Sequence, residues 1–106
     1  MNVESTGPIK HAAVSLASTG TIVAAVSGKK IRVLALALTG ESDGVVSFNL
    51  ESATTDISGV MNMVAGTPMV MPFNPAGWCD TAAGEKLDAT IAAGELYGMI
   101  TYQEIN

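Results

Sequence analysis

The chain has 106 residues and a mass of 10.8 kDa, the size of one domain built around a single hydrophobic core. With 48% apolar and only 14% charged residues, the composition excludes an intrinsically disordered protein. Five Lys and Arg residues against ten Asp and Glu residues give a net charge of −5, the wrong sign for a general nucleic-acid-binding protein. We therefore expect one acidic domain over residues 1–106, with residues 1–9 as an extended N-terminal arm.

The distribution of cysteine and of apolar runs excludes further classes. Cys79 is the single cysteine, so no intramolecular disulfide can form and stability must come from packing or assembly. The longest apolar run, residues 33–38, is far shorter than the roughly 18 residues of a membrane-spanning helix. The first eight residues lack a basic region followed by an apolar run, so the sequence predicts no signal peptide and synthesis in a cytoplasm.

The first third of the chain shows short segments of period-two alternation separated by turn residues, typical of β-sandwiches and barrels. Strands are predicted over residues 12–16 and 21–27. Residues 27–30 are predicted to form a hairpin connection, because Gly28 can adopt a positive φ at little cost. The third strand, residues 31–39, is apolar on both faces, so we expect both faces to be covered.

Three further strands are predicted in the middle of the chain, over residues 45–50, 60–64 and 69–73. The segments between them are rich in Gly, Asn, Asp, Thr and Pro, which favour turns and loops. These connections are residues 40–44, 54–56, 66–68 and 74–77.

Residues 81–93 allow two readings, a helix capped by Asp80 or a strand over residues 87–91. An interior Gly84 would cost such a helix about 1 kcal/mol, so the strand is favoured. A last strand over residues 96–105 is rich in strand-forming residues. The complete pattern predicts an all-β fold, an antiparallel, jelly-roll-like β-sandwich of about eight short strands.

Side chains with catalytic or metal-binding chemistry are few and scattered. His11 has no nucleophile motif near it in the sequence, and His11 with Cys79 supplies too few ligands for a zinc site. The acidic residues 41–43 offer oxygen ligands, but calcium needs six to eight of them, so a solvated loop is predicted. The sequence thus predicts no catalytic residues, no metal and no cofactor.

Three of the five basic side chains gather around one predicted connection, namely Lys29, Lys30 and Arg32. One reading is a charged tip that keeps the connection soluble. The other is docking onto an acidic protein surface through charge complementarity.

Leucine, methionine and tryptophan side chains supply the candidates for core or subunit interface. Methionine fills irregular gaps in cores and forms adaptable contact surfaces, so either role suits the spaced pairs in this chain. The candidates are Leu34, Leu36, Leu38, Met61, Met63, Met69, Met71 and Trp78.

Three segments together resemble small virion proteins of tailed bacteriophages. They are TIVAAVSGKKIRV at residues 21–33, MPFNPAGW at 71–78 with TAAGEKL at 81–87, and YGMITY at 97–102. More narrowly, the chain resembles the jelly-roll-like capsid decoration, or cement, proteins that sit on the head surface, commonly as trimers.

The resemblance implies a structural protein and not an enzyme. It implies a homotrimer that binds the phage major capsid protein and resides on the capsid surface of the virion after synthesis in the host cytoplasm. Neither nucleic acid nor membrane is an implied partner. Within this reading, Lys29, Lys30 and Arg32 are the candidates for the contact with the coat.

Two other functional classes are considered. A receptor- or carbohydrate-binding module of a phage head or tail fibre predicts an exposed aromatic side chain at Trp78 or Tyr97. A small enzyme is the poorest option, because the sequence offers no set of nucleophile, base and orienting partner.

Overall fold

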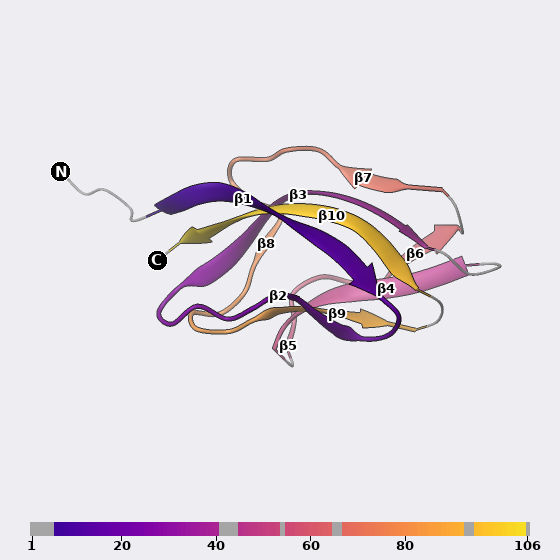
Figure 1. The fold of residues 1–106 in the computed structure, drawn as a ribbon, viewed down its shortest axis with the longest axis horizontal. Helices are drawn as coiled ribbons and strands as arrows, with labels where there is room; N and C mark the ends of the chain where they lie inside the picture. Colours follow the sequence, from indigo (N-terminus) through magenta and orange to yellow (C-terminus); the bar gives the residue numbers. More distant parts are fainter. Residues whose placement is uncertain (1–5, 41–44, 54, 65–66, 93–94, 106) are drawn as a thin grey trace.

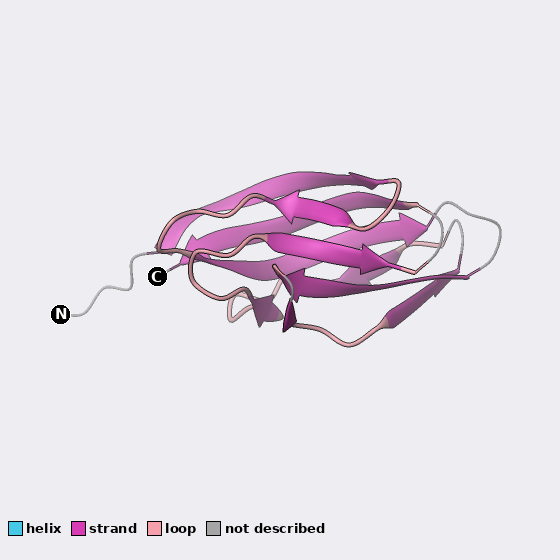
Figure 2. Cartoon of the chain, turned by 90° about the horizontal axis from the view of Figure 1, so that it is seen from below, coloured by secondary structure: helices cyan, strands magenta, loops and turns pink. Residues whose placement is uncertain are grey.

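The computed structural model describes residues 6–40, 45–53, 55–64, 67–92 and 95–105. These residues form ten strands and no helix (Figures 1 and 2). The strands are β1 (Thr6–Leu16), β2 (Gly20–Val23), β3 (Lys30–Gly40), β4 (Val45–Ser52), β5 (Thr55–Asp56), β6 (Met61–Val64), β7 (Met69–Met71), β8 (Cys79–Asp80), β9 (Leu87–Ile91) and β10 (Leu96–Ile105). Accordingly, the described part of the chain has no helix long and apolar enough to cross a membrane.

The strands form two antiparallel sheets packed face to face. Sheet I has the order β1-β10-β3, with β7 and β8 both paired to the remaining edge of β3. Sheet II has the order β2-β9-β4, with β5 and β6 both paired to β4. When each of these split edges is counted as one interrupted strand, the sandwich has two four-stranded layers in jelly-roll order. The predicted fold class is confirmed.

Proline explains the interruption between β7 and β8. The connecting residues 72–78 include Pro72 and Pro75, which lack the backbone N–H that a continuous ladder with β3 requires. The loop still follows the edge of β3, since the Asn74 and Trp78 amides donate to the carbonyls of Leu34 and Val33.

A β-bulge in β3 explains its long apolar run. Opposite β10, Tyr102 pairs with Val33 and Thr101 with Ala35, which leaves Leu34 as an extra residue. The extra residue shifts the alternation by one position. The buried side chains before it, Ile31 and Val33, and those after it, Leu36 and Leu38, therefore all pack in the core. Ala35 and other residues of the opposite face remain half-exposed. The prediction that both faces are covered is therefore wrong, because only the face toward sheet II is packed.

The core lies between the two sheets and takes side chains from both. Its largest members include Phe48 and Leu50 from β4, together with Leu87 from β9, all of them 1% exposed or less. The predicted core residues Leu34, Leu36, Leu38 and Met63 are buried, while Met61, Met69 and Met71 are partly buried and pack against the core.

The predicted hairpin at residues 27–30 is wrong in one respect. The turn exists, with Gly28 at φ 74° and the Lys29 amide donating to the Val26 carbonyl at 3.0 Å. However, β2 pairs with β9 in sheet II, whereas β3 pairs with β10 in sheet I. The connection therefore crosses from one sheet to the other, because turn residues specify a reversal but not which strand the next segment pairs with.

The two readings of residues 81–93 resolve in favour of the strand. Leu87 and Ala89 point into the core with no exposed surface, and Gly84 lies in a turn at φ 79°. The segment 54–56, predicted as a turn, contributes β5, a two-residue strand that folds back on Glu51 and Ser52. At the N-terminus, β1 begins at Thr6, so residues 6–9 of the predicted arm belong to a strand and residues 1–5 lie outside the described residues.

Candidate functional site

The basic turn between β2 and β3 is joined to a second loop that sequence analysis had not connected with it. The Gly84 amide donates to the Lys29 carbonyl at 2.7 Å, and the Glu85 amide donates to the Ala82 carbonyl at 3.1 Å. The loop 81–86 therefore lies beside the turn at one end of the sandwich (Figure 1). Lys86, in this loop, brings a fourth of the five basic residues to the same end.

A cleft of about 570 Å³ opens where this loop meets the start of β3 and the β4–β5 hairpin. Its size lies in the range of ligand-binding clefts, roughly 300–1,000 Å³. Ser52 holds one wall in place, because its hydroxyl donates to Glu85 Oε1 at 2.6 Å and accepts from the Ala82 amide at 2.8 Å. Lys30 lines the cleft together with Asp80 and Glu85, so the cleft carries both charge signs.

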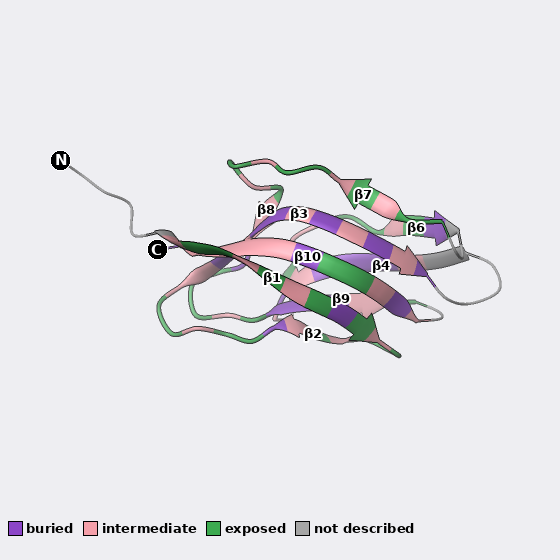
Figure 3. Cartoon of the chain, turned by 45° about the horizontal axis from the view of Figure 1, so that its top comes forward, coloured by how far each residue is buried: buried purple, intermediate pink, exposed green. Residues whose placement is uncertain are grey.

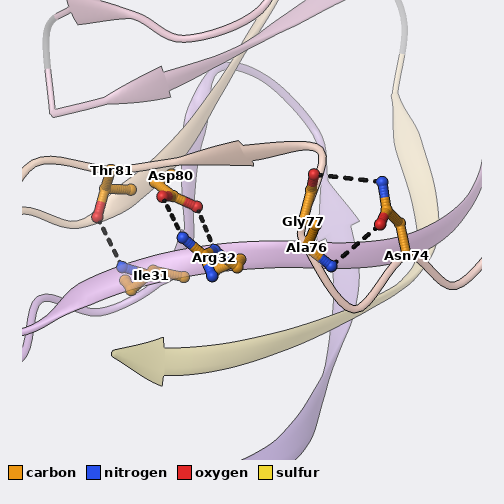
Figure 4. A network of polar contacts seen from close by, with 7 residues as sticks. All are labelled: Ile31, Arg32, Asn74, Ala76, Gly77, Asp80 and Thr81. Atoms are coloured by element: carbon orange, nitrogen blue, oxygen red, sulfur yellow. Dashed lines mark hydrogen bonds and ion pairs between the residues drawn. The ribbon is translucent and has the colours of Figure 1, made fainter. Parts of the chain in front are cut away.

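Arg32 has a structural role that the sequence did not reveal. Its Nε and Nη2 atoms donate to the two carboxylate oxygens of Asp80 at 2.9 and 3.0 Å (Figure 4). Such bidentate pairs are stronger and more directional than single contacts. Gly77 lies directly against the arginine stem, since a Cβ there would be 2.4 Å from Arg32 Cγ.

Neighbouring hydrogen bonds complete this network. The Ile31 amide donates to Thr81 Oγ1 at 2.9 Å, which satisfies a buried backbone donor. Asn74 accepts from the Ala76 amide at 3.0 Å and closes the turn that ends at Gly77 (Figure 4). Of the three predicted coat contacts, the structure thus places Arg32 in a packed ion pair that fixes β8 to β3.

Cys79 is half-buried on β8 and unsuited to nucleophilic chemistry. Burial, with a smaller contribution from the adjacent Asp80 carboxylate, raises the pKa of its thiol from 9.0 to about 11. Because only the thiolate is nucleophilic, the thiol is inert near neutral pH.

Alkylation of Cys79 by iodoacetamide at pH 8 should therefore be about 100-fold slower in the folded protein than in the urea-unfolded chain. The folded-state rate should continue to rise through pH 9 and level off only near pH 11, since the thiolate forms there. A rate that levels off at pH 9 in the folded protein would contradict this description of the thiol.

The aromatic and histidine candidates lie on the surface. Trp78 is 44% exposed, and its indole Nε1 donates to the Pro72 carbonyl at 2.9 Å. It is therefore not a core residue, in contrast to the leucines with which it was grouped. Tyr97 is half-buried, and its hydroxyl donates to Glu95. His11 is exposed on β1, with Nδ1 3.0 Å from Thr101 Oγ1.

The described ranges contain no cluster of side chains suited to binding a metal ion. Nowhere in them do three or more His, Cys, Asp or Glu side chains gather at distances suited to one ion. The acidic segment 41–43, considered above as a source of oxygen ligands, lies outside the described residues.

Sequence analysis missed three exposed apolar residues of sheet I and its edge, namely Val70, Phe73 and Met99. The sequence did contain an indication for Val70 and Phe73, because they lie in a stretch, residues 57–79, that contains no charged side chain. It also missed Lys86, since the sequence separation from Lys29 conceals a proximity that only the fold creates. No family model, curated protein or solved structure matches the chain.

Proposed function

We propose that the protein is a structural virion component that decorates and stabilises a bacteriophage capsid by binding across neighbouring major coat protein subunits. Two features support this proposal. The three segments described above resemble capsid decoration proteins, and the jelly roll is an architecture used by viral capsid proteins. Fold alone does not define function, so the argument depends on the surface.

The observation that carries the proposal is the gathering of basic side chains in two adjoining segments, where they lie among acidic neighbours. Four of the five basic residues lie in the adjoining segments 29–32 and 86, on a chain whose net charge is −5. Arg32 is held by Asp80, and Lys86 lies 3.6 Å from Asp88. Lys30, which lines the cleft, and the adjacent Lys29 are the residues proposed to meet the coat. Lys29 and Lys30 would give this acidic molecule a local contact point for an acidic surface, which favours one orientation of approach.

The proposed action is mechanical and needs no chemistry. A protein that binds the expanded shell but not its precursor stabilises the expanded state by mass action. Binding across two coat subunits adds a connection that must break before the shell can open. The cleft next to Lys30 offers space for a segment of the coat between the two loops.

Charge reversal at the basic end tests the proposal. We expect Lys30→Glu to lower occupancy on expanded heads at least tenfold, and the double variant Lys29→Glu/Lys30→Glu to lower it further, because attraction becomes like-charge repulsion. Occupancy is measured by co-sedimentation with heads and quantitative gel analysis. The control is Ser15→Glu, which adds a negative charge at an exposed position of β1 opposite Tyr97, at the other end of sheet I from Lys30. Undiminished occupancy of the double variant would exclude this contact.

A carbohydrate-binding module of a phage fibre is the second candidate, and the exposure of Trp78 favours it. Its ring could stack on a sugar face, as exposed aromatic side chains do with planar ligands. Trp78 is the single tryptophan, so its fluorescence reports binding directly. Quenching by host-surface glycans, with no binding to heads, would replace the decoration proposal with this one.

A further inference from the structure

β1 is a long strand with one unpaired edge. It pairs with β10 over residues 9–16, and no other strand of the described residues pairs with its opposite edge. The remaining edge strands of both sheets have two to four residues each. Folded proteins keep edge strands short or obstruct them, because an open row of N–H and C=O groups pairs with other strands. The eleven-residue β1 departs from this rule.

Hydrogen bonds within sheet I identify the backbone groups that face this edge. The carbonyls of Ile31 and Val33 accept hydrogen bonds on the side of β8, at 2.9 and 2.8 Å. Successive residues of a strand turn their N–H and C=O groups to opposite sides, so Arg32 directs its groups toward β10, where Gln103 lies opposite. Gln103 therefore directs its own groups toward β3 and none toward β1.

The same alternation applies to β1. Ile9 lies opposite Gln103, so the backbone groups of Ile9 point away from β10 to the open edge. Every second residue after Ile9 points the same way, which adds His11 and Ala13. Within the described residues these outward groups find no backbone partner. Each of the three residues offers one donor and one acceptor, so residues 9–13 present an open row of hydrogen-bonding groups.

Local features define the ends of this open row. On one side Pro8 has no N–H, and the register of β1 against β10 shifts between Thr6 and Ile9. On the other side β2 borders the end of β1, since a Cβ at Gly20 would lie 3.2 Å from Leu16 Cδ2. Residues 9–13 contain no proline and no bulge, and Figure 3 shows exposed positions along β1. The edge is therefore accessible over about five residues, an ordinary length for a strand.

We propose that an extended segment of the coat protein binds to residues 9–13 of β1 as an added strand of sheet I. The inference rests on the proposed function and deepens it, because binding across two coat subunits requires a contact besides Lys29 and Lys30. β10 lies between β1 and β3, so the two contacts are at least roughly 10 Å apart across the sheet. Main-chain hydrogen bonds would supply affinity, and the half-exposed Ile9 would supply an apolar cross-strand contact.

The chemistry of the edge selects the class of partner. Alternating donors and acceptors at the strand repeat match another extended polypeptide backbone, and sugars or small metabolites do not present this repeat. Between two candidate polypeptides, charge favours the coat segment. Two whole copies of this chain each carry a net charge of −5 and repel on approach, whereas one coat segment brings a strand without a second acidic body.

Proline at an outward position tests the added strand. We expect Ala13→Pro to lower occupancy on expanded heads at least tenfold, because it removes a donor that β1 does not share with β10 and its ring obstructs a neighbouring backbone. The matched control is Val70→Pro in β7, at the opposite edge of sheet I. Val70 lies opposite Ala37, which by the alternation along β10 faces β10, so Val70 also points outward. Thermal unfolding shows whether both variants fold, and co-sedimentation measures their occupancy.

Hydrogen exchange of the wild type gives a second test that needs no substitution. In the free protein the Ala13 amide should exchange at least tenfold faster than the Ala12 amide, because Ala12 bonds to β10. On expanded heads, exchange at Ala13 should slow at least tenfold as the coat segment accepts its hydrogen bond. An Ala13 amide that already exchanges slowly in the free protein would show that the edge is occupied without the coat, which overturns the inference.

The occupancy of the wild type on heads separates this inference from the proposed function. Heads that bind the wild type and Ala13→Pro equally, with the Ala13 amide unprotected, overturn the added strand alone. Equal losses of occupancy in Ala13→Pro and Val70→Pro overturn it as well, since the effect then does not depend on the edge of β1. Heads that leave even the wild type unbound overturn the decoration function itself.

Discussion

Replacing Gly98 with alanine should destabilise the protein by at least about 4 kcal/mol, a large fraction of the roughly 5–15 kcal/mol that stabilises a typical domain. Gly98 sits in β10 at φ 141°, and a Cβ there would lie 2.0 Å from the Ala37 carbonyl oxygen. The obstructing atoms belong to the backbone of β3, so no side-chain rotation can relieve the contact. Urea unfolding followed by circular dichroism measures the change in free energy.

Two other glycines provide controls that separate steric overlap from backbone conformation. Gly28→Ala should cost only about 1–2 kcal/mol, because Gly28 has φ 74° but no atom within 4 Å of a Cβ. Gly59→Ala should have little effect, since it has neither a positive φ nor a close neighbour. Equal losses at Gly98 and Gly28 would show that the approach of β10 to β3 is not as close as described.

Phe48→Ala should lower the free energy of unfolding by about 3–5 kcal/mol. Phe48 is 1% exposed on β4 and packs in the core between the sheets, so truncation leaves a large cavity. Thermal and urea unfolding of the variant provide the measurement.

The chain supplies its own control, because it contains only one other phenylalanine. Phe73 is 55% exposed, so Phe73→Ala should change the free energy of unfolding by less than about 0.5 kcal/mol. Comparable losses of stability in the two variants would contradict the assignment of one ring to the core and the other to the surface.

Local sequence signals were enough to predict the class of fold. Period-two alternation depends only on neighbouring residues, which is why the strands near 31–39, 87–91 and 96–105 could be predicted. The same holds for the turn at Gly28, whose positive φ follows from the residue type. An all-β sandwich follows when such strands must bury one face each.

Pairing partners could not be predicted, because they depend on contacts distant in sequence. The bulge at Leu34 and the crossing of residues 24–29 between sheets arise from how β3 meets β10 and how β2 meets β9. The partner of Arg32 is likewise 48 residues away in sequence. A pattern along one strand contains no information about the charge opposite it.

The sequence by itself determined the size, acidity and β-sandwich class of this protein, and it singled out the basic segment 29–32, because these properties follow from composition and local periodicity. Only the tertiary structure decided that Lys86 joins this segment, that Arg32 is held by Asp80, and that Phe73 and Met99 share an exposed face. The physical reason is that strand pairing and sheet packing bring distant residues together, and these surfaces exist only once both sheets have formed.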